Sequence, residues 1–250
     1  MNILILFDDT KKFCMLISSI IPRLRKDFSN SSIEVFSDSD YCRKFLAHIP
    51  GISDISSNII LNEYDKVFCF DDSVSHLIEY RDIKCKEYIG YTFSENQIHF
   101  TCKAVEKFFN CYCLKSGCDD NILSSFFNAF GFSWNKEGFN ISYRAKSKSK
   151  DDRSGVAISN DNLRSFVKMS MFSHGEKLWH IPIRQDPLKC IDEVNKCSNI
   201  VTDNIFYAFV GSFLRKKIIF LVEDGCSFSP DIFNDIFIQH ISEQILYAQD

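Results

Sequence analysis

Acidic and hydroxyl side chains stand directly after several short apolar segments of this 250-residue chain. Asp8, Asp9 and Thr10 follow the apolar run 2–7, and Ser159 and Asn160 end a similar run that begins at Val156. A carboxylate at such a place can accept a proton, while hydroxyl and backbone N–H groups can hold an anion. Further candidates of this kind follow later apolar runs: Asp71, Asp72, Ser73, Thr202, Asp203, Asn204, Glu223 and Asp224.

The segments that must position these residues alternate between strand and helix in the first half of the chain. The apolar runs are short and β-prone, and the intervening stretches carry apolar residues at helical spacing. Strands are predicted over 2–7, 33–36, 52–60 and 65–70, and helices over 13–27, 40–47 and 74–80, followed by a helical, aromatic-rich region over 99–130. Such alternation predicts a parallel sheet with right-handed crossovers.

The second half repeats the alternation after a polar, basic stretch. Strands are predicted over 156–159, 178–183, 199–202 and 217–222, and helices over 161–172, 186–197, 204–214 and 231–247, with Asp161 and Asp186 as helix N-caps. We therefore predict a domain over 1–142, a basic linker over 143–154 and a smaller domain over 155–250. Ligands of parallel sheets bind outside the carboxyl ends of the strands, so the candidate residues should face a cleft between the domains.

Composition excludes several common sites. The nine glycines are too widely spaced for a GxGxxG fingerprint, a Walker A loop or a GxSxG elbow, so an anion would be held by helix N-termini and side chains. Lys11 and Lys12 are candidates for this role. With a formal net charge of −4 at pH 7, the chain is not expected to bind nucleic acid.

The eleven cysteines suggest neither a disulfide framework nor a metal centre. No secretory signal precedes Asp8, so we expect a cytoplasmic protein with reduced thiols. No apolar run approaches the roughly 18 residues needed to span a bilayer, although the basic linker could contact the surface of the inner membrane. The cluster His99, Cys102, Cys111, Cys113 and Cys118 has a poor spacing for zinc, and no metal site is predicted.

Several segments in order along the chain resemble glycosyltransferase family 9, the lipopolysaccharide heptosyltransferases. The opening MNILILFDDT and the turn 49–55 resemble the start of the family's amino-terminal domain, and segments 64–71 and 88–91 are similar to its "yDlVidl" and "RiGf" elements. Segment 197–221 is similar to "advvisnDTGpmHlAaAlgkPvvaLF", but it lacks the Gly and the His of that motif.

The resemblance implies a GT-B-like α/β fold with two Rossmann-like parallel-sheet domains facing a cleft. It implies inverting, metal-independent transfer of a sugar such as heptose from a nucleotide sugar, with an ADP-linked donor as the first candidate, and no cofactor. Asp8 or Asp9 would be the base, in the acceptor-side domain 1–142. Residues predicted to bind the donor are Thr10, Lys11, Ser159, Asn160, Thr202, Asp203, Asn204 and Glu223. The acceptor would be a surface glycan, a lipid-linked glycan or a protein.

Structural alternatives exist for each of these residues. One of Asp8 and Asp9 could cap the following helix, Asp203 could be an N-cap, and Ser159 with Asn160 could form a turn and a cap. Two alternative functions also remain. The missing Gly and His and the short second domain would suit a non-catalytic binding or scaffold subunit, and segment 197–221 is also similar to an element of polysaccharide pyruvyl transferases.

Overall fold

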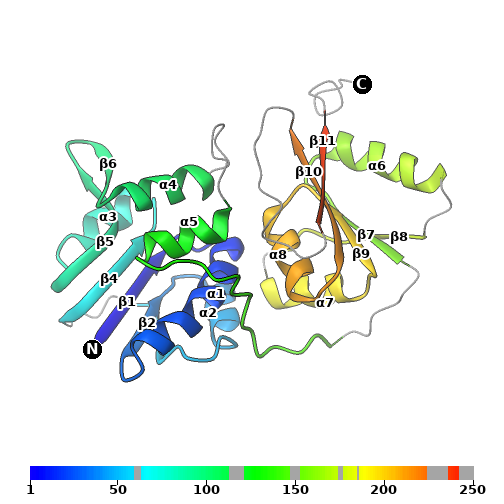
Figure 1. Cartoon of the computed structure of the whole chain (residues 1–250). Coiled ribbons are helices and arrows are strands. Elements are labelled where there is room, and N and C mark those ends of the chain that lie inside the picture. The colour runs from blue at the N-terminus through cyan, green and yellow to red at the C-terminus, as the bar shows by residue number, and fades with distance from the viewer. Residues whose placement is uncertain are drawn as a thin grey trace. The chain divides into compact units, whose positions relative to one another are not determined.

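The chain folds as two compact α/β units, Met1–Ser142 and Tyr143–Asp250, which we call unit 1 and unit 2. The structure is a computed structural model and describes residues 1–58, 63–112, 121–146, 153–173, 177–184, 186–223 and 236–241 (Figure 1). Each unit has its own sheet with helices on its faces, so each is considered separately.

The sheet of unit 1 has the strand order β3-β2-β1-β4-β5-β6, and all its pairs are parallel except β5 with β6. The strands are β1 (Asn2–Phe7), β2 (Ser32–Phe36), β3 (Asp54–Ser56), β4 (Tyr64–Phe70), β5 (Cys85–Ser94) and β6 (Gln97–Phe100). The helices are α1 (Lys11–Asp27), α2 (Asp40–Leu46), α3 (Val74–Tyr80), α4 (Lys103–Tyr112) and α5 (Ile122–Ala129).

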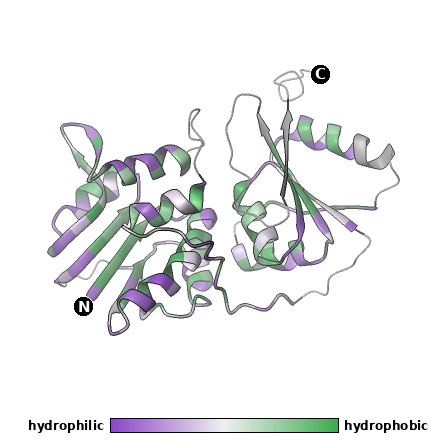
Figure 2. Cartoon of the chain, viewed as in Figure 1, coloured by the Kyte–Doolittle hydropathy of each residue, from purple (hydrophilic) through white to green (hydrophobic). Residues whose placement is uncertain are grey.

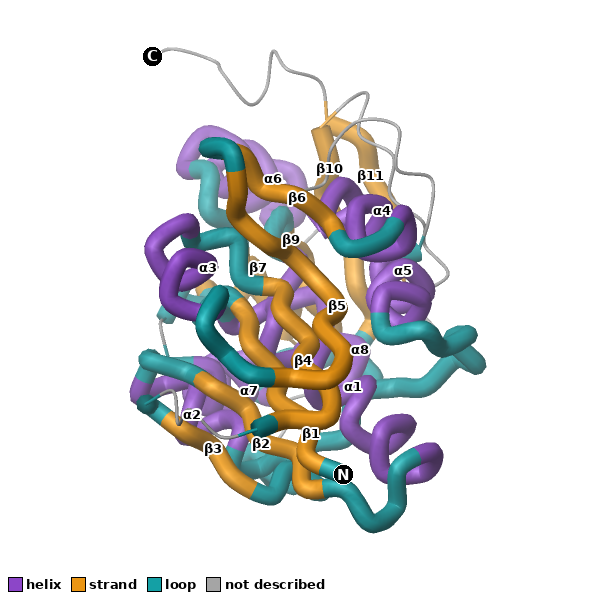
Figure 3. Tube along the Cα trace, turned by 90° about the vertical axis from the view of Figure 1, so that its left-hand side faces the viewer, coloured by secondary structure: helices purple, strands orange, loops and turns teal. Residues whose placement is uncertain are grey.

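Aromatic side chains fill the core on one face of this sheet. Phe13 of α1 contacts Phe108 of α4 and Phe126 of α5, and all three rings meet Phe70 of β4 at centroid distances of 5.5–6.0 Å. In Figure 3, α4 and α5 lie on one side of the strands and α3 on the other. The central strands are mostly apolar (Figure 2), as expected for parallel strands covered on both faces.

An antiparallel hairpin, β5–β6, lies mostly before the predicted helical region 99–130 and overlaps it only at residues 99–100. Its turn places Glu95 and Asn96 at φ of 50° and 59°, so the turn lacks the glycine that usually signals such a hairpin. Gly90 in β5 has a φ of 140°, and a Cβ there would lie 1.9 Å from the Cys69 carbonyl oxygen. Only glycine therefore allows β5 to approach β4 so closely.

Unit 2 has an entirely parallel sheet with the strand order β11-β10-β9-β7-β8. The strands are β7 (Arg153–Ala157), β8 (Lys177–His180), β9 (Asn199–Thr202), β10 (Lys217–Glu223) and β11 (Ile236–Ile241), and the helices are α6 (Asp161–Ser173), α7 (Pro187–Asn195) and α8 (Ile205–Phe213). Leu163 and Val167 of α6 pack on one face of the sheet against Val156 and Val201. Helices α7 and α8 lie on the other face (Figure 1).

Two sequence predictions for unit 2 are wrong. Residues 236–241, placed in a helix over 231–247, form β11, which pairs along its full length with β10. The β-branched and aromatic residues of this segment favour a strand once a parallel partner is available, and local helical spacing does not reveal that partner. Asp161 is not an N-cap, because the side chain of the preceding residue, Asn160, accepts the Leu163 N–H at 2.9 Å.

The linker is also shorter than the predicted span 143–154, because β7 already begins at Arg153. Tyr143 and Lys146 at its start are bound to Asp192 of α7. The loop prediction failed at Arg153 and Ser154 because their polar character is typical of loops, whereas strand pairing with β8 and β9 determines their conformation.

Both sheets contain a topological switch point, where the strand order changes direction. In unit 1 it lies between β1 and β4, and in unit 2 between β7 and β9. At such points the neighbouring loops diverge at the carboxyl ends of the strands and leave room for a ligand. The residues after β1 and after β9 lie at these two switch points.

Candidate active site

The switch point of unit 1 brings two acidic loops together. Phe7 of β1 pairs in register with Phe70 of β4, so the loops that start at Asp8 and Asp71 leave the same edge of the sheet side by side. The sequence predicted that both loops follow the carboxyl ends of buried strands, and the pairing of β1 with β4 makes them neighbours. The sequence did not predict the side chains that the two loops contact.

Asp8 is half-buried and is held by hydroxyl groups. The Tyr112 hydroxyl lies 2.8 and 3.0 Å from its two carboxylate oxygens, and the Thr10 hydroxyl donates to Oδ1 at 2.9 Å. Burial raises the pKa of Asp8 to about 6, although the bonds from Tyr112 and Thr10 and the charge of Lys12 act in the opposite direction. At neutral pH, Asp8 is thus mainly ionised and more basic than an ordinary aspartate.

Tyr112 comes from the end of α4, and no sequence signal connected it to Asp8. It is buried, and burial together with the charge of Asp8 raises its pKa well above the usual value, so its hydroxyl remains a donor. The Lys12 ammonium lies 3.5 Å from the centre of the Tyr112 ring and donates to the Tyr112 carbonyl at 3.2 Å. The first turn of α1 and the last turn of α4 together hold the Asp8 carboxylate.

Asp9 has a different role from its neighbour. Its carboxylate accepts the N–H groups of Asp38 at 2.8 Å and Ser39 at 3.1 Å, as well as the Ser37 hydroxyl. Burial of the carboxyl raises the pKa of Asp9, although these three bonds oppose the rise. Asp9 therefore fastens the loop between β2 and α2 to the end of β1, whereas the less exposed Asp8 accepts from side-chain hydroxyls and has its pKa raised to about 6.

Thr10 and Lys11 begin α1. Thr10 is the N-cap, since its hydroxyl oxygen accepts the Phe13 N–H at 3.3 Å, so the cap predicted for Asp8 or Asp9 belongs to the next residue. Lys11 is half-exposed in the first turn of the helix. Both predicted donor-binding residues of unit 1 thus lie beside Asp8 in sequence, with Thr10 bound to its carboxylate.

A histidine for which the sequence carries no signal lies in the first turn of α3, next to the loop that starts at Asp71. Asp71 is buried, and its carboxylate accepts from His76 Nδ1 at 2.7 Å, from the Tyr80 hydroxyl at 3.1 Å and from the Ser73 N–H at 2.9 Å. Burial alone would lower the pKa of His76, but the bond and charge of Asp71 and the charge of Asp38 raise it overall. Asp71 is therefore a structural anchor for the start of α3.

The switch point of unit 2 is closed by hydrogen bonds within the protein. The Asp203 carboxylate accepts the Ser159 N–H at 2.9 and 3.0 Å and the Asn160 N–H at 3.3 Å. Asn204, not Asp203, is the N-cap of α8, accepting the Phe206 N–H at 3.0 Å, so the alternative that Asp203 is a cap is wrong. Asp203 instead joins the loops that follow β7 and β9.

Two donor-binding candidates of unit 2 remain, Thr202 and Glu223. Thr202 is fully buried, and its hydroxyl donates to the Ala157 carbonyl at 2.6 Å. The backbone of Glu223 ends β10, in register with Ile241 of β11. Asp224 lies outside the described residues. The structure thus brings Ser159, Asn160, Thr202, Asp203 and Asn204 together, but through contacts with one another and with nearby backbone groups.

One thiol reaches this region, since Cys42 Sγ donates to the Asp9 carbonyl oxygen at 3.6 Å. In the described part of the chain, no group of three His, Cys, Asp or Glu side chains could hold a metal ion, while Cys113 and Cys118 lie outside that part. Free thiols are found at Cys14, Cys42, Cys69, Cys85, Cys102, Cys190 and Cys197. Cys111 is disulfide-bonded, so the expectation that all thiols are reduced is wrong at that residue. Over the same described ranges, no helix is long and apolar enough to cross a membrane.

Comparison with known proteins identifies the fold. No protein-family model matches the sequence, and no curated protein resembles it significantly. Among solved structures, the chain is similar to E. coli ADP-heptose lps heptosyltransferase II, with a TM-score of 0.61 and 10% identity over 99% of this chain and 94% of that one. It is also similar to a glycosyl transferase family 9 protein from Veillonella parvula, with a TM-score of 0.63 and 10% identity over 96% and 86% of the two chains.

A third similar structure is E. coli heptosyltransferase WaaC with ADP, with a TM-score of 0.57 and 8% identity over 96% of this chain and 93% of that one. The predicted fold class, GT-B-like with two Rossmann-like parallel-sheet domains, is therefore confirmed. The predicted resemblance to divergent family 9 proteins is also confirmed at the level of the fold.

Proposed function

We propose that this chain is a glycosyltransferase that moves a sugar from a nucleotide-sugar donor to a hydroxyl group of a glycan, lipid-linked or protein acceptor. Heptose and an ADP-linked donor are the first candidates, since two of the similar structures are described with ADP-heptose or ADP. The observation that carries the proposal is Asp8, a half-buried carboxylate with a raised pKa at the switch point of unit 1.

The proposed reaction inverts the sugar and needs one base. Asp8 takes the proton from the acceptor hydroxyl while the acceptor oxygen forms a bond to the anomeric carbon. The bond from that carbon to the diphosphate breaks at the same time, and the nucleoside diphosphate leaves with the electron pair. A pKa near 6 suits a base at neutral pH, because the carboxylate is ionised and still accepts a proton readily.

Tyr112 and Thr10 position the base in this proposal. Both hydroxyls donate to Asp8, so they hold its carboxylate in one orientation and stabilise the ionised form. Lys11 and Lys12, at the start of α1, supply positive charge for the leaving diphosphate. We propose that this charge replaces a metal ion, in keeping with the metal-independent transfer that the family resemblance implies.

The test is the release of nucleoside diphosphate from ADP-, GDP-, UDP- and CMP-linked sugars in the presence of candidate acceptors, for the natural chain and for Asp8→Asn and Asp9→Asn. Loss of turnover in Asp8→Asn, with turnover retained in Asp9→Asn, is the expected result. Full activity in Asp8→Asn would overturn the assignment of the base.

A non-catalytic binding or scaffold subunit remains a second candidate, favoured by the closed switch point of unit 2. The N–H groups of Ser159 and Asn160, two residues predicted to bind the donor, already donate to Asp203. Thermal shift with the same nucleotide sugars separates the two candidates, since a ligand that binds only the folded state raises the melting temperature. A response to phosphoenolpyruvate alone would instead indicate the pyruvyl transferase alternative.

The location and partners of the protein follow from this proposal. A nucleotide-sugar donor is a cytoplasmic substrate, so we place the reaction in the cytoplasm, with peripheral contact to the inner membrane where the acceptor is lipid-linked. No nucleic-acid partner is proposed, because the chain is acidic overall.

A further inference from the structure

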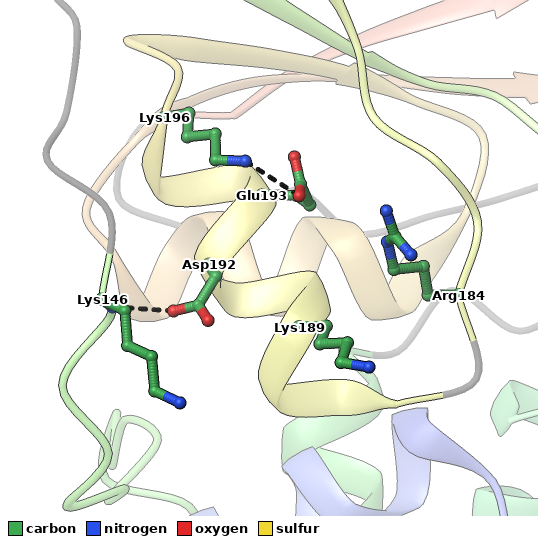
Figure 4. A pocket seen from close by; sticks show the side chains of 6 residues that line it. All are labelled: Lys146, Arg184, Lys189, Asp192, Glu193 and Lys196. Atoms are coloured by element: carbon green, nitrogen blue, oxygen red, sulfur yellow. Dashed lines mark hydrogen bonds and ion pairs between the residues drawn. The ribbon is translucent and has the colours of Figure 1, made fainter.

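A pocket of about 460 Å³ lies over one face of α7 in unit 2, away from the residues assigned so far. Lys189, Asp192, Glu193 and Lys196 have the spacing i, i+3, i+4 and i+7, so they share this face of the helix. Arg184, from the segment between β8 and α7, and Lys146, from the linker, complete the lining (Figure 4). Four of these six side chains are basic, and two are acidic.

The two carboxylates of the pocket are already engaged by the protein. Asp192 accepts the Tyr143 hydroxyl at 3.0 Å on both oxygens and the Lys146 N–H at 2.8 Å. Glu193 accepts from the Lys196 ammonium at 2.9 Å and from the Trp179 indole N–H at 3.4 Å. The acids therefore fix the linker, Lys196 and Trp179, and the lining residues carry two more positive than negative charges.

Two of the basic residues, Arg184 and Lys196, have further contacts that restrict them. Arg184 donates its N–H to the Tyr207 hydroxyl at 3.3 Å, and Tyr207 is fully buried in the core of unit 2. The Lys196 ammonium lies 5.4 Å from the centre of the Trp179 ring, which restricts its position further. In Figure 4, the ammonium groups of Lys146 and Lys189 point away from the Asp192 carboxylate. The ammonium groups of Lys146 and Lys189 are therefore not directed at the nearest carboxylate.

We propose that this pocket is a binding site for a small ligand that carries a diphosphate group. Its volume is in the range of small-molecule sites, about 300–1,000 Å³. Lysine and arginine side chains placed around one cavity are the groups that bind phosphoryl oxygens in proteins. The surplus of two positive charges matches an anion that carries two or more negative charges. The six lining residues are all charged, so the pocket suits a polar ligand and not a lipid chain.

The site goes beyond the proposed transfer reaction and is separate from the strand-end residues predicted for the donor. It is built only from residues of unit 2, so it depends neither on Asp8 nor on the switch point. Two sources of a diphosphate are compatible with the same chemistry, a nucleoside diphosphate and a diphosphate without a base. Binding of ADP and of inorganic pyrophosphate distinguishes them.

Isothermal titration of the full chain with pyrophosphate and with ADP tests the proposal, using Lys146→Glu and Lys189→Glu as variants. Both lysines are exposed, so their replacement should leave the fold intact. Lys168→Glu, which changes an exposed lysine of α6 outside the pocket, is the matched control for charge.

We expect each pocket variant to weaken pyrophosphate binding about tenfold or more, because it removes one charged contact, while Lys168→Glu stays within about twofold. Binding should also weaken as salt is raised. Equal affinity of the natural chain and both pocket variants, or no binding of either anion at millimolar concentration, would overturn the proposal. The loss of binding in Lys146→Glu and Lys189→Glu is measured without any transfer reaction, so the failure of this site and the failure of the proposed base are distinguishable.

Discussion

The two switch points of the molecule use the same type of residue in opposite ways. In unit 1, the half-buried carboxylate of Asp8 is held by the hydroxyls of Tyr112 and Thr10. In unit 2, the carboxylate of Asp203 accepts backbone N–H groups of Ser159 and Asn160. Both residues follow a buried parallel strand, and nothing in their immediate sequence separates them.

The type of donor explains the difference. Backbone N–H groups cannot move away from their loop, so a carboxylate bound to them joins two loops and becomes part of the framework. Hydroxyl donors at the ends of side chains hold a carboxylate without closing the loops around it. Asp9 resembles Asp203 in this respect, since it accepts N–H groups of Asp38 and Ser39. We therefore take an acid at a strand end as a candidate base when its donors are side-chain hydroxyls and not the backbone N–H groups of a second loop.

The largest expected effect is on transfer itself. Asp8→Asn should lower the rate of sugar transfer by about 10²–10⁴, the usual contribution of a general base, without loss of the fold. Release of nucleoside diphosphate measures the rate, and circular dichroism checks the fold. Asp9→Asn is the control, because an amide retains one acceptor for the loop. An equal loss of transfer rate in Asp8→Asn and Asp9→Asn would contradict the assignment of Asp8, and not Asp9, as the base.

The raised pKa of Asp8 should appear in the pH dependence of stability. Its folded-state pKa is about 6, above the ordinary value of about 3.9, so the folded state binds the proton more tightly. The contribution of Asp8 to the free energy of unfolding is greatest below about pH 4. It falls by about 2–3 kcal/mol as the pH rises through 6.

Urea unfolding at pH 4 to 8 measures this dependence as the difference between the natural chain and Asp8→Asn. The variant should lack the decline and should be the more stable protein at pH 8. A difference between the two proteins that does not change with pH would show that Asp8 has an ordinary pKa.

Replacing the structural acids should instead lower stability. Asp203→Ala and Asp9→Ala leave backbone N–H groups without an acceptor, and each should lower the free energy of unfolding by about 1–3 kcal/mol. Urea unfolding at pH 7 measures the loss. Asp161→Ala is the control, because this side chain is 86% exposed and its removal should change stability by less than about 0.5 kcal/mol.

A gain of nucleotide binding in Asp203→Ala would sharpen the comparison, since it would show that Asp203 occupies an anion site. If Asp203→Ala were as stable as the natural chain, Asp203 would not be a structural acid that joins two loops.

The smallest effect concerns Tyr112. Tyr112→Phe removes a hydrogen bond that stabilises ionised Asp8, so the pKa of Asp8 should rise by about one unit above its value of about 6. Titration of the Asp8 carboxyl by NMR measures this directly, and the acidic limb of the pH–rate profile should move by the same amount. Tyr143→Phe, which removes a hydroxyl bound to Asp192 instead, should leave the titration of Asp8 unchanged.

Much of the fold could be predicted because the relevant signals are local. Buried runs such as 2–7 and 65–70 end in polar residues, and their alternation with helices implies parallel sheets. The hairpin β5–β6 was missed because its turn has Glu95 and Asn96 in place of glycine. The strand β11 was missed because its conformation depends on pairing with β10, which spacing within the segment does not reveal.

The sequence by itself determined which residues reach the ligand-binding edges of the two sheets, because strand ends and helix starts are decided by neighbouring residues. The tertiary structure alone decided what each acid does there. The partner of Asp8 is Tyr112, 104 positions away, and the partner of Asp203 is Ser159, 44 positions away. The basicity of a carboxylate depends on burial and on the donors around it, and both are properties of the packed chain.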